Sequence, residues 1–65
     1  MMHISCKIGD LVEIIDDKNL SIRRIAVVVE QSPHRKHVFR IRYVENGVFS
    51  EPVWKHAFDF HKCLA

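Results

Sequence analysis

Four side chains near the two ends of this 65-residue chain carry the donor atoms that metal chemistry needs. His3 and Cys6 lie near the start of the sequence, and His61 and Cys63 lie near its end. Imidazole nitrogen and thiolate sulfur are ligands that Zn²⁺ prefers, and four of them make a structural site. If the first and last strands of the fold run side by side, these residues can converge on a zinc ion.

The two cysteines allow other outcomes besides zinc. A disulfide between Cys6 and Cys63 closes a long loop and, by the loop-entropy estimate, adds about 4 kcal/mol to stability. In a reducing cytoplasm, free thiols are the default state of such a pair. The His-x-x-Cys and His-x-Cys spacings differ from those of common zinc fingers. We therefore expect free thiols, with zinc and a disulfide as open alternatives.

The middle of the chain is strongly basic, although the formal net charge of the whole chain is only +2. Between residues 23 and 42, Glu30 is the one acidic residue, against Arg23, Arg24, Arg35, Lys36, Arg40 and Arg42. Arg40 and Arg42 alternate along one expected strand and so share a face. These six residues are the candidate partner-binding site, for an acidic protein surface or for phosphates. The alternative is that Arg40 and Arg42 pair with Glu30 and Glu51 across the sheet.

Sequence motifs of the common enzyme classes do not occur in this chain. It has no glycine-rich phosphate loop, no nucleophile elbow and no His-Glu zinc helix. A chain of this length also has little room for the concave pocket that an active site usually occupies. We therefore expect a binding protein that has no catalytic residues and no cofactor.

The composition predicts one globular domain over residues 1–65, since 48% of the residues are hydrophobic and 28% are charged. The longest apolar run, from Ile25 to Val29, is far shorter than the roughly 20 residues that span a bilayer. Met1 to Lys7 lacks the pattern of a secretory signal. The cytoplasm is therefore the expected compartment.

Two-residue alternation and a high content of β-branched residues predict an all-β fold. The expected strands are 11–15, 22–30, 38–44, 48–51 and 58–63, with a helical turn near 53–57. Asn46-Gly47 predicts a tight type I′ hairpin, because both residues tolerate the positive φ that this turn demands. Curling so short a sheet into a five-stranded barrel buries one face and removes exposed edges. The expected core is Val12, Ile14, Ile25, Val27, Phe39, Ile41 and Trp54.

Three segments carry a family resemblance. Lys7-Ile8-Gly9-Asp10-Leu11-Val12 resembles the hydrophobic-Gly-Asp-x-Val opening of small SH3-like barrels of the KOW and Tudor-like groups. Ile25-Ala26-Val27-Val28-Val29-Glu30 is similar to the Gly-x-Val-Val-Glu second strand of short phage-encoded proteins of this type. Arg40-Ile41-Arg42-Tyr43, followed by Asn46-Gly47, is similar to their third strand and hairpin. The resemblance implies an SH3-like barrel, with Trp54 in the place of the aromatic residue that precedes their final strand.

The resemblance also implies a function, since phage proteins of this kind act as small accessory, virion or host-binding proteins. The expected function is a non-enzymatic protein-binding module of phage origin, acting on a host protein or as a minor virion component. Its expected location is then the host cytoplasm or the virion. The alternative is a weak, sequence-nonspecific nucleic-acid-binding barrel that uses the basic residues. The sequence leaves the partner and the oligomeric state open.

Overall fold

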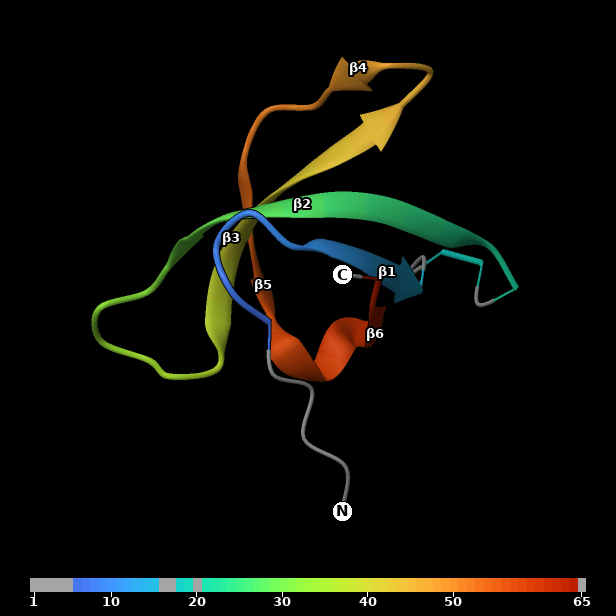
Figure 1. The fold of residues 1–65 in the computed structure, drawn as a ribbon. Coiled ribbons are helices and arrows are strands. Elements are labelled where there is room, and N and C mark those ends of the chain that lie inside the picture. The colour runs from blue at the N-terminus through green and yellow to red at the C-terminus, as the bar shows by residue number, and fades with distance from the viewer. Residues whose placement is uncertain (1–5, 16–17, 20, 65) are drawn as a thin grey trace.

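The computed structural model describes residues 6–15, 18–19 and 21–64, and these form an all-β fold (Figure 1). Its elements are β1 (Leu11–Ile15), β2 (Arg23–Gln31), β3 (Val38–Glu45), β4 (Val48–Phe49), β5 (Val53–His56), a 3-10 helix (Ala57–Asp59) and β6 (Phe60–Cys63). The expected fold class, all-β with one short helical turn, is confirmed for these residues. No helix among them has the length and apolar character to cross a bilayer.

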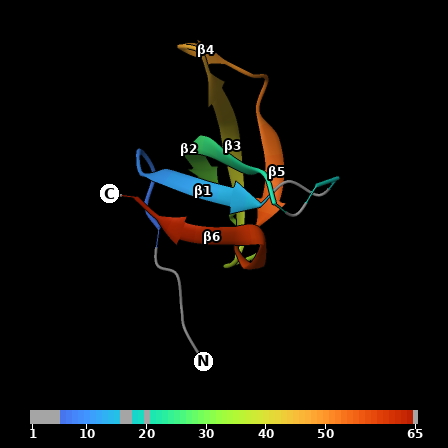
Figure 2. The same ribbon diagram turned by 90° about the vertical axis from the view of Figure 1, so that its right-hand side faces the viewer.

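The strands form one sheet in the order β4-β3-β2-β1-β6, with β5 also paired to β3. Each of these pairs is antiparallel. The last strand thus returns to lie beside the first, as Figure 2 shows with β1 and β6 in front of β3 and β5. β4 and β5 lie end to end along one edge of β3, β4 against Val44 and Glu45 and β5 against Val38 to Ile41. The described residues therefore contain six strands, one more than the sequence predicts.

The prediction of a helical turn near residues 53–57 is wrong for most of these residues. Residues Val53–His56 form β5, and the 3-10 helix follows at Ala57–Asp59. The free edge of β3 offers a hydrogen-bonding ladder to these residues, and β-branched and aromatic side chains such as Val53 and Trp54 suit a strand. The Nδ1 atom of His56 accepts a hydrogen bond of 3.3 Å from the backbone N–H of Phe58 and so caps the helix. The last strand consequently begins at Phe60 rather than at Phe58.

The predicted hairpin at Asn46-Gly47 is confirmed. Asn46 has a φ of 53° and Gly47 a φ of 76°, so both central residues are in the left-handed region that a type I′ turn requires. The strands on either side pair Val44 with Phe49 and Glu45 with Val48, which leaves a two-residue loop. The hairpin projects away from the rest of the sheet in both views (Figures 1 and 2).

The core lies on the inner face of the curled sheet. Its buried residues are Val12, Ile14, Ala26, Val28, Phe39, Ile41, Ala57 and Phe60. The rings of Phe39 and Phe60, which lie far apart in the sequence, have centroids 5.8 Å apart. The four expected core residues in β1 and β3 are confirmed.

The core positions expected in β2 are wrong by one residue. Ala26 and Val28 are buried, whereas Ile25 and Val27 lie on the opposite face and are only half-buried. An uninterrupted apolar run has no polar residue to mark its solvent side, so its phase is set by register with the neighbouring strands. The expected core residue Trp54 is also wrong, because it lies beside Arg40 on the outer face and is 49% exposed.

Cys6 and Cys63 form a disulfide, so the expectation of free thiols is wrong. The pairing of β6 with β1 brings the two ends together, and the Cα atoms of the cysteines are 6.2 Å apart, within the usual range for a disulfide. A zinc site needs thiolate sulfurs, whereas these two sulfurs are bonded to each other. His3 lies outside the described residues, and Nε2 of His61 is 3.8 Å from Oε1 of Glu13. Of the alternatives, the structure has the disulfide.

Candidate partner-binding surface

The six basic residues singled out by the sequence are divided between two faces of the sheet and one loop. Arg40 and Arg42 lie on the outer face, away from the core, because the buried residues Phe39 and Ile41 alternate with them along β3. Arg23 shares this face, since it forms an ion pair with Glu13 of β1. Arg24 points to the inner side. The predicted set is therefore not one continuous basic patch.

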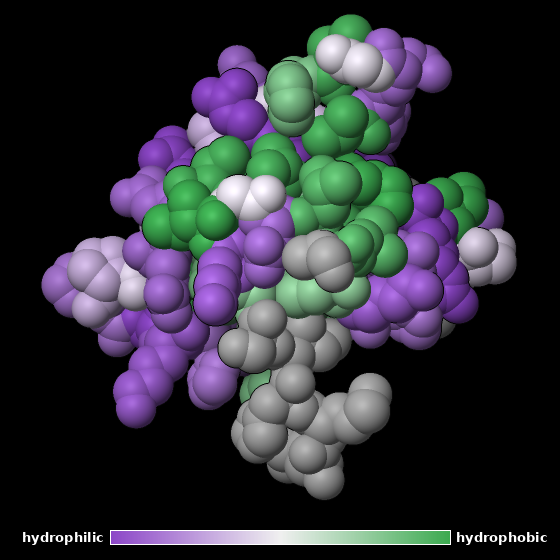
Figure 3. All heavy atoms as spheres, viewed as in Figure 1, coloured by the Kyte–Doolittle hydropathy of each residue, from purple (hydrophilic) through white to green (hydrophobic). Residues whose placement is uncertain are grey.

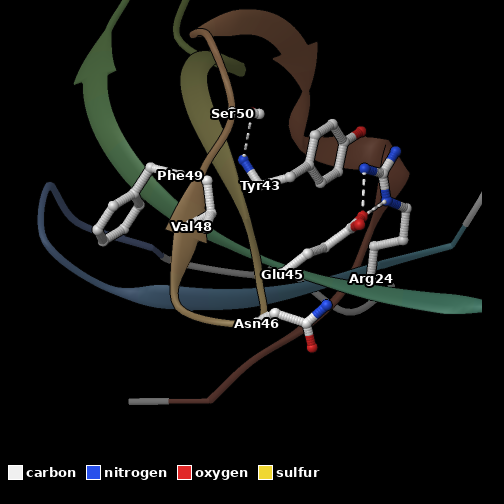
Figure 4. A pocket seen from close by; sticks show the side chains of 7 residues that line it. All are labelled: Arg24, Tyr43, Glu45, Asn46, Val48, Phe49 and Ser50. Carbon is white, nitrogen blue, oxygen red and sulfur yellow. Dashed lines mark hydrogen bonds and ion pairs between the residues drawn. The ribbon is translucent and has the colours of Figure 1, made fainter.

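Arg24 lies opposite the buried residue Ile14 in the pairing of β1 with β2 and covers one end of the core. Its guanidinium carbon lies 3.7 Å from the centre of the Tyr43 ring, a cation–π contact. Its Nε and one Nη donate to the same oxygen of Glu45, at 3.1 and 2.6 Å (Figure 4). Arg24 therefore holds the base of the β3–β4 hairpin against β2.

A shallow pocket of about 310 Å³ lies beside this contact. It is lined by Arg24, Tyr43, Glu45, Asn46, Val48, Phe49 and Ser50. Ser50 Oγ accepts a 2.9 Å hydrogen bond from the Tyr43 backbone N–H and donates to the Glu51 carbonyl, so its hydroxyl is already used. In Figure 4 the ring of Phe49 points to the other side of the hairpin from Arg24 and Tyr43. Arg24 and Ser50 are engaged in contacts within the chain. We therefore interpret the pocket as part of the packing that supports the hairpin.

Two of the outer-face arginines are paired with acidic residues. Nη1 of Arg23 lies 3.4 Å from Oε1 of Glu13. Nη1 of Arg40 lies 3.3 Å from Oε1 of Glu30 on the neighbouring strand. The guanidinium of Arg40 also faces the Trp54 ring at 5.6 Å. The cross-strand pairing predicted for Arg40 and Glu30 is confirmed. Among the residues that the structure describes, Arg42 has no such carboxylate partner, in Glu51 or elsewhere.

Arg35 and Lys36 lie in the loop that joins β2 to β3, and their side chains are exposed. Two side chains hold the backbone of this loop. Ser32 Oγ accepts from the N–H of His34 and of Arg35, and Gln31 Nε2 donates to the carbonyl of Lys36. Neither Arg35 nor Lys36 forms an ion pair within the described part of the chain. Two accessible charges thus lie on this loop.

The outer face around Arg42 is apolar. Cross-strand register places Leu11 of β1 opposite Val27 of β2, and Val27 opposite Arg42 of β3. Residues that are opposite in register project from the same side of a sheet. By the same alternation this outer apolar face contains Leu11, Ile25, Val27, Val44, Phe49, Trp54 and Leu64. Figure 3 shows hydrophobic side chains gathered across the middle of the molecule, where β1 and β2 run in Figure 1.

Two large aromatic side chains stand at the borders of this face. Phe49 pairs with Val44 and is 56% exposed, and Trp54 pairs with Arg40 and is half exposed. Tryptophan and arginine are the residue types most enriched among those that dominate protein interfaces, and tyrosine and phenylalanine are common there. The outer apolar face thus combines apolar area, aromatic borders and a cation, Arg42, that has no acidic partner among the described residues.

A separate group of rings surrounds Phe58, which is 80% exposed. Its ring centre lies 4.3 Å from that of His56 and 6.0 Å from that of His37. This group covers the 3-10 helix and the end of β5. It is small and isolated compared with the outer apolar face, which extends over β1, β2 and β3.

The sequence reasoning missed the outer apolar face, although a signal for it was present. Ile25 to Val29 is apolar at every position, whereas a strand with one solvated face alternates between apolar and polar residues. An apolar run in a central strand indicates that both faces are apolar. The prediction from sequence placed Ile25 and Val27 of this run in the core and assigned no role to the opposite face of the strand.

The chain matches no protein-family model, no curated protein and no solved structure. The residues of the outer apolar face are therefore the basis on which a function is proposed.

Proposed function

We propose that the protein is a non-enzymatic protein-binding module that uses its outer apolar face. The observation that carries this proposal is that β2 is apolar on both sides, with Ala26 and Val28 in the core and Ile25 and Val27 on the outer face. The described residues provide no second layer over the outer face. Large exposed apolar patches with polar borders are typical of protein interaction sites.

The fold proposed for this module is a closed SH3-like barrel. The 3-10 helix supports closure because it connects β5, which is paired to β3 at one edge of the sheet, to β6, which is paired to β1 at the other edge. β4 and β5 follow one edge of β3 and are two parts of a strand that is interrupted before Val53. Counted in this way, the barrel has five strands.

A phage origin and a virion location complete the proposal. The resemblance of the Ile25–Glu30 and Arg40–Tyr43 segments to short phage proteins supports the origin, and the partner is then a host protein or a virion protein. The Cys6–Cys63 disulfide favours the virion over the host cytoplasm, because cytoplasmic thiols are kept reduced whereas disulfides persist on virion surfaces.

Capture of partners from a host lysate and from disrupted particles tests the proposal. The immobilised wild type is compared with Leu11→Glu, which places a charge in the outer apolar face and leaves the core unchanged. Arg35→Glu, on the β2–β3 loop, is the matched control. We expect the wild type and the Arg35→Glu variant to capture the same protein, and Leu11→Glu to lose it while keeping its melting temperature.

Two results contradict the proposal. One is a captured protein that Leu11→Glu still binds as strongly as the wild type does. The other is the absence of any captured protein, together with absence of the chain from purified particles. Capture of a protein is not sufficient by itself, because only its dependence on Leu11 shows that the outer apolar face is the binding surface.

Nucleic-acid binding is the second candidate function. The observation in its favour is that Arg35, Lys36 and Arg42 are exposed and lack acidic partners among the described residues. Phosphate binding through a few such cations predicts an affinity that falls steeply with salt and weakens in an Arg40→Glu/Arg42→Glu variant. Titration of labelled single- and double-stranded DNA and RNA at low and high salt measures this. Lack of binding at low salt excludes it.

A further inference from the structure

Arg42 is a cation with apolar neighbours on the outer face. It lies opposite Val27 in the register of β2 with β3, and Val44 follows it on the same side of the strand. The nearest basic residue on this face, Arg40, already has Glu30 as its partner. Arg42 is exposed, so water solvates its charge in the free protein. A partner that covers this face removes the water.

This desolvation places a condition on the partner. A buried charge without a counter-charge is strongly unfavourable, and truncating one member of a desolvated pair strongly weakens binding. A partner that covers Leu11 and Val27 must therefore supply a group for the guanidinium. A carboxylate suits it best, because its two oxygens match the planar donors of arginine.

Resting on the proposed function, we infer that the partner is a protein segment with apolar side chains and one Asp or Glu that pairs with Arg42. The apolar side chains lie over Leu11 and Val27, and the carboxylate lies at the β3 side of that row. Phe49, which pairs with Val44, and Trp54, which pairs with Arg40, flank the Arg42 end of that row.

The same charge argues against a second copy of this chain on the face. A two-fold axis that passes close to Arg42 brings Arg42 of one copy toward Arg42 of the other, and like charges repel most when they are desolvated. The apolar neighbours of Arg42 argue against nucleic acid on this face, because Leu11, Val27 and Val44 have no group that binds phosphate. Nucleic-acid binding needs several cations that together neutralise several phosphates.

Selection from a random 12-residue peptide-display library tests the inference. The disulfide-bonded protein is immobilised, and binding peptides are selected on the wild type, on Arg42→Glu and on the control Arg35→Glu. We expect peptides selected on the wild type to share an acidic residue flanked by apolar residues. On Arg42→Glu we expect the acidic residue to be replaced by Lys or Arg, and on Arg35→Glu to be retained.

Affinities of one selected peptide, made synthetically, give the second measurement. We expect Arg42→Gln to weaken its binding at least tenfold, since hydrogen bonds to a charged group are among the stronger ones. The peptide with its acidic residue changed to the amide should lose a similar factor on the wild type. That peptide should show little further loss on Arg42→Gln, because the pair is already broken.

The outcomes separate this inference from the proposed function. If the peptides depend on Leu11 but show no acidic preference and no effect of Arg42→Gln, the inference is wrong and the proposed function stands. If no peptide is selected, or if binding is unaffected by Leu11→Glu, both are wrong. If sedimentation shows a dimer that Leu11→Glu dissociates, the occupant is a second copy and the inference is overturned.

Discussion

The two faces of the apolar part of β2 are built from nearly the same residue types but are in different situations. Along β2, Ala26 and Val28 face inward and are completely buried, while Ile25 and Val27 face outward and are half-buried. The inner face is enclosed by buried residues of β1, β3, the 3-10 helix and β6, such as Phe39 and Phe60. On the outer face the apolar residues are bordered by ion pairs and exposed aromatic rings. The comparison indicates that hydrophobicity alone does not distinguish a core from a binding surface; what packs against it does.

The largest effect expected on the inner side comes from the disulfide, because Cys6 and Cys63 pack against the core. Their separation of 57 residues predicts a loss of about 4 kcal/mol when both are changed to serine, chiefly through the entropy of the unfolded chain. For a domain of this size that loss is a large part of the total stability. Urea unfolding of Cys6→Ser/Cys63→Ser measures it.

The wild type with and without a reducing agent is the control for this prediction. Reduction should lower the unfolding midpoint by about as much as the double substitution does. An unfolding midpoint that neither treatment changes would show that the pairing does not contribute to stability.

The second prediction compares the two faces directly with a matched pair of substitutions. Val28→Ala leaves a cavity in the core and is expected to cost about 2 kcal/mol, whereas Val27→Ala on the outer face is expected to cost less than about 1 kcal/mol. The two changes remove the same atoms from neighbouring positions of one strand. Urea unfolding measures both, and equal losses would mean that the two faces are equally enclosed in solution.

The third prediction concerns the two-residue turn, Asn46-Gly47, that joins β3 to β4. Gly47→Ala is expected to cost about 1 kcal/mol, because Gly47 has a φ of 76° and a side chain is strained there. A methyl group at this position meets no atom within 4 Å, so the cost is one of backbone conformation and not of crowding. Thermal unfolding measures it, with Asn46→Gly as a control that keeps the turn. A fully retained melting temperature in Gly47→Ala would contradict the assigned turn.

The smallest effect is expected at the ion pairs of the outer face. Arg40→Gln removes the pair with Glu30, and because both side chains are about half exposed to water, which screens the pair, the expected loss is about 0.5 kcal/mol or less. The difference from the wild type should shrink further at 1 M salt, where exposed charges are screened. Chemical unfolding at low and high salt measures this. A loss of several kcal/mol would mean that the outer face is much less exposed to water than the structure indicates.

Local sequence patterns were enough to predict β3 and the hairpin. In Phe39, Ile41 and the arginines between them, inward and outward residues differ in polarity, so the alternation assigns each a face. Asn46-Gly47 specifies its turn through the φ angles that these two residues tolerate. The outward position of the candidate binding residue Arg42 was predicted in the same way, because it follows from the two-residue period of the strand.

The tertiary structure decided the features that depend on strands distant in the sequence. The face of β2 follows from its register with β1 and β3, and the strand Val53–His56 exists because β3 has an edge to pair with. The disulfide requires β6 to return beside β1. The separation of Arg24 from Arg42 likewise depends on which side of the curled sheet each position faces. A residue's own neighbours in the sequence fix its local conformation, but only its neighbours in space determine whether it is enclosed, paired or left for a partner.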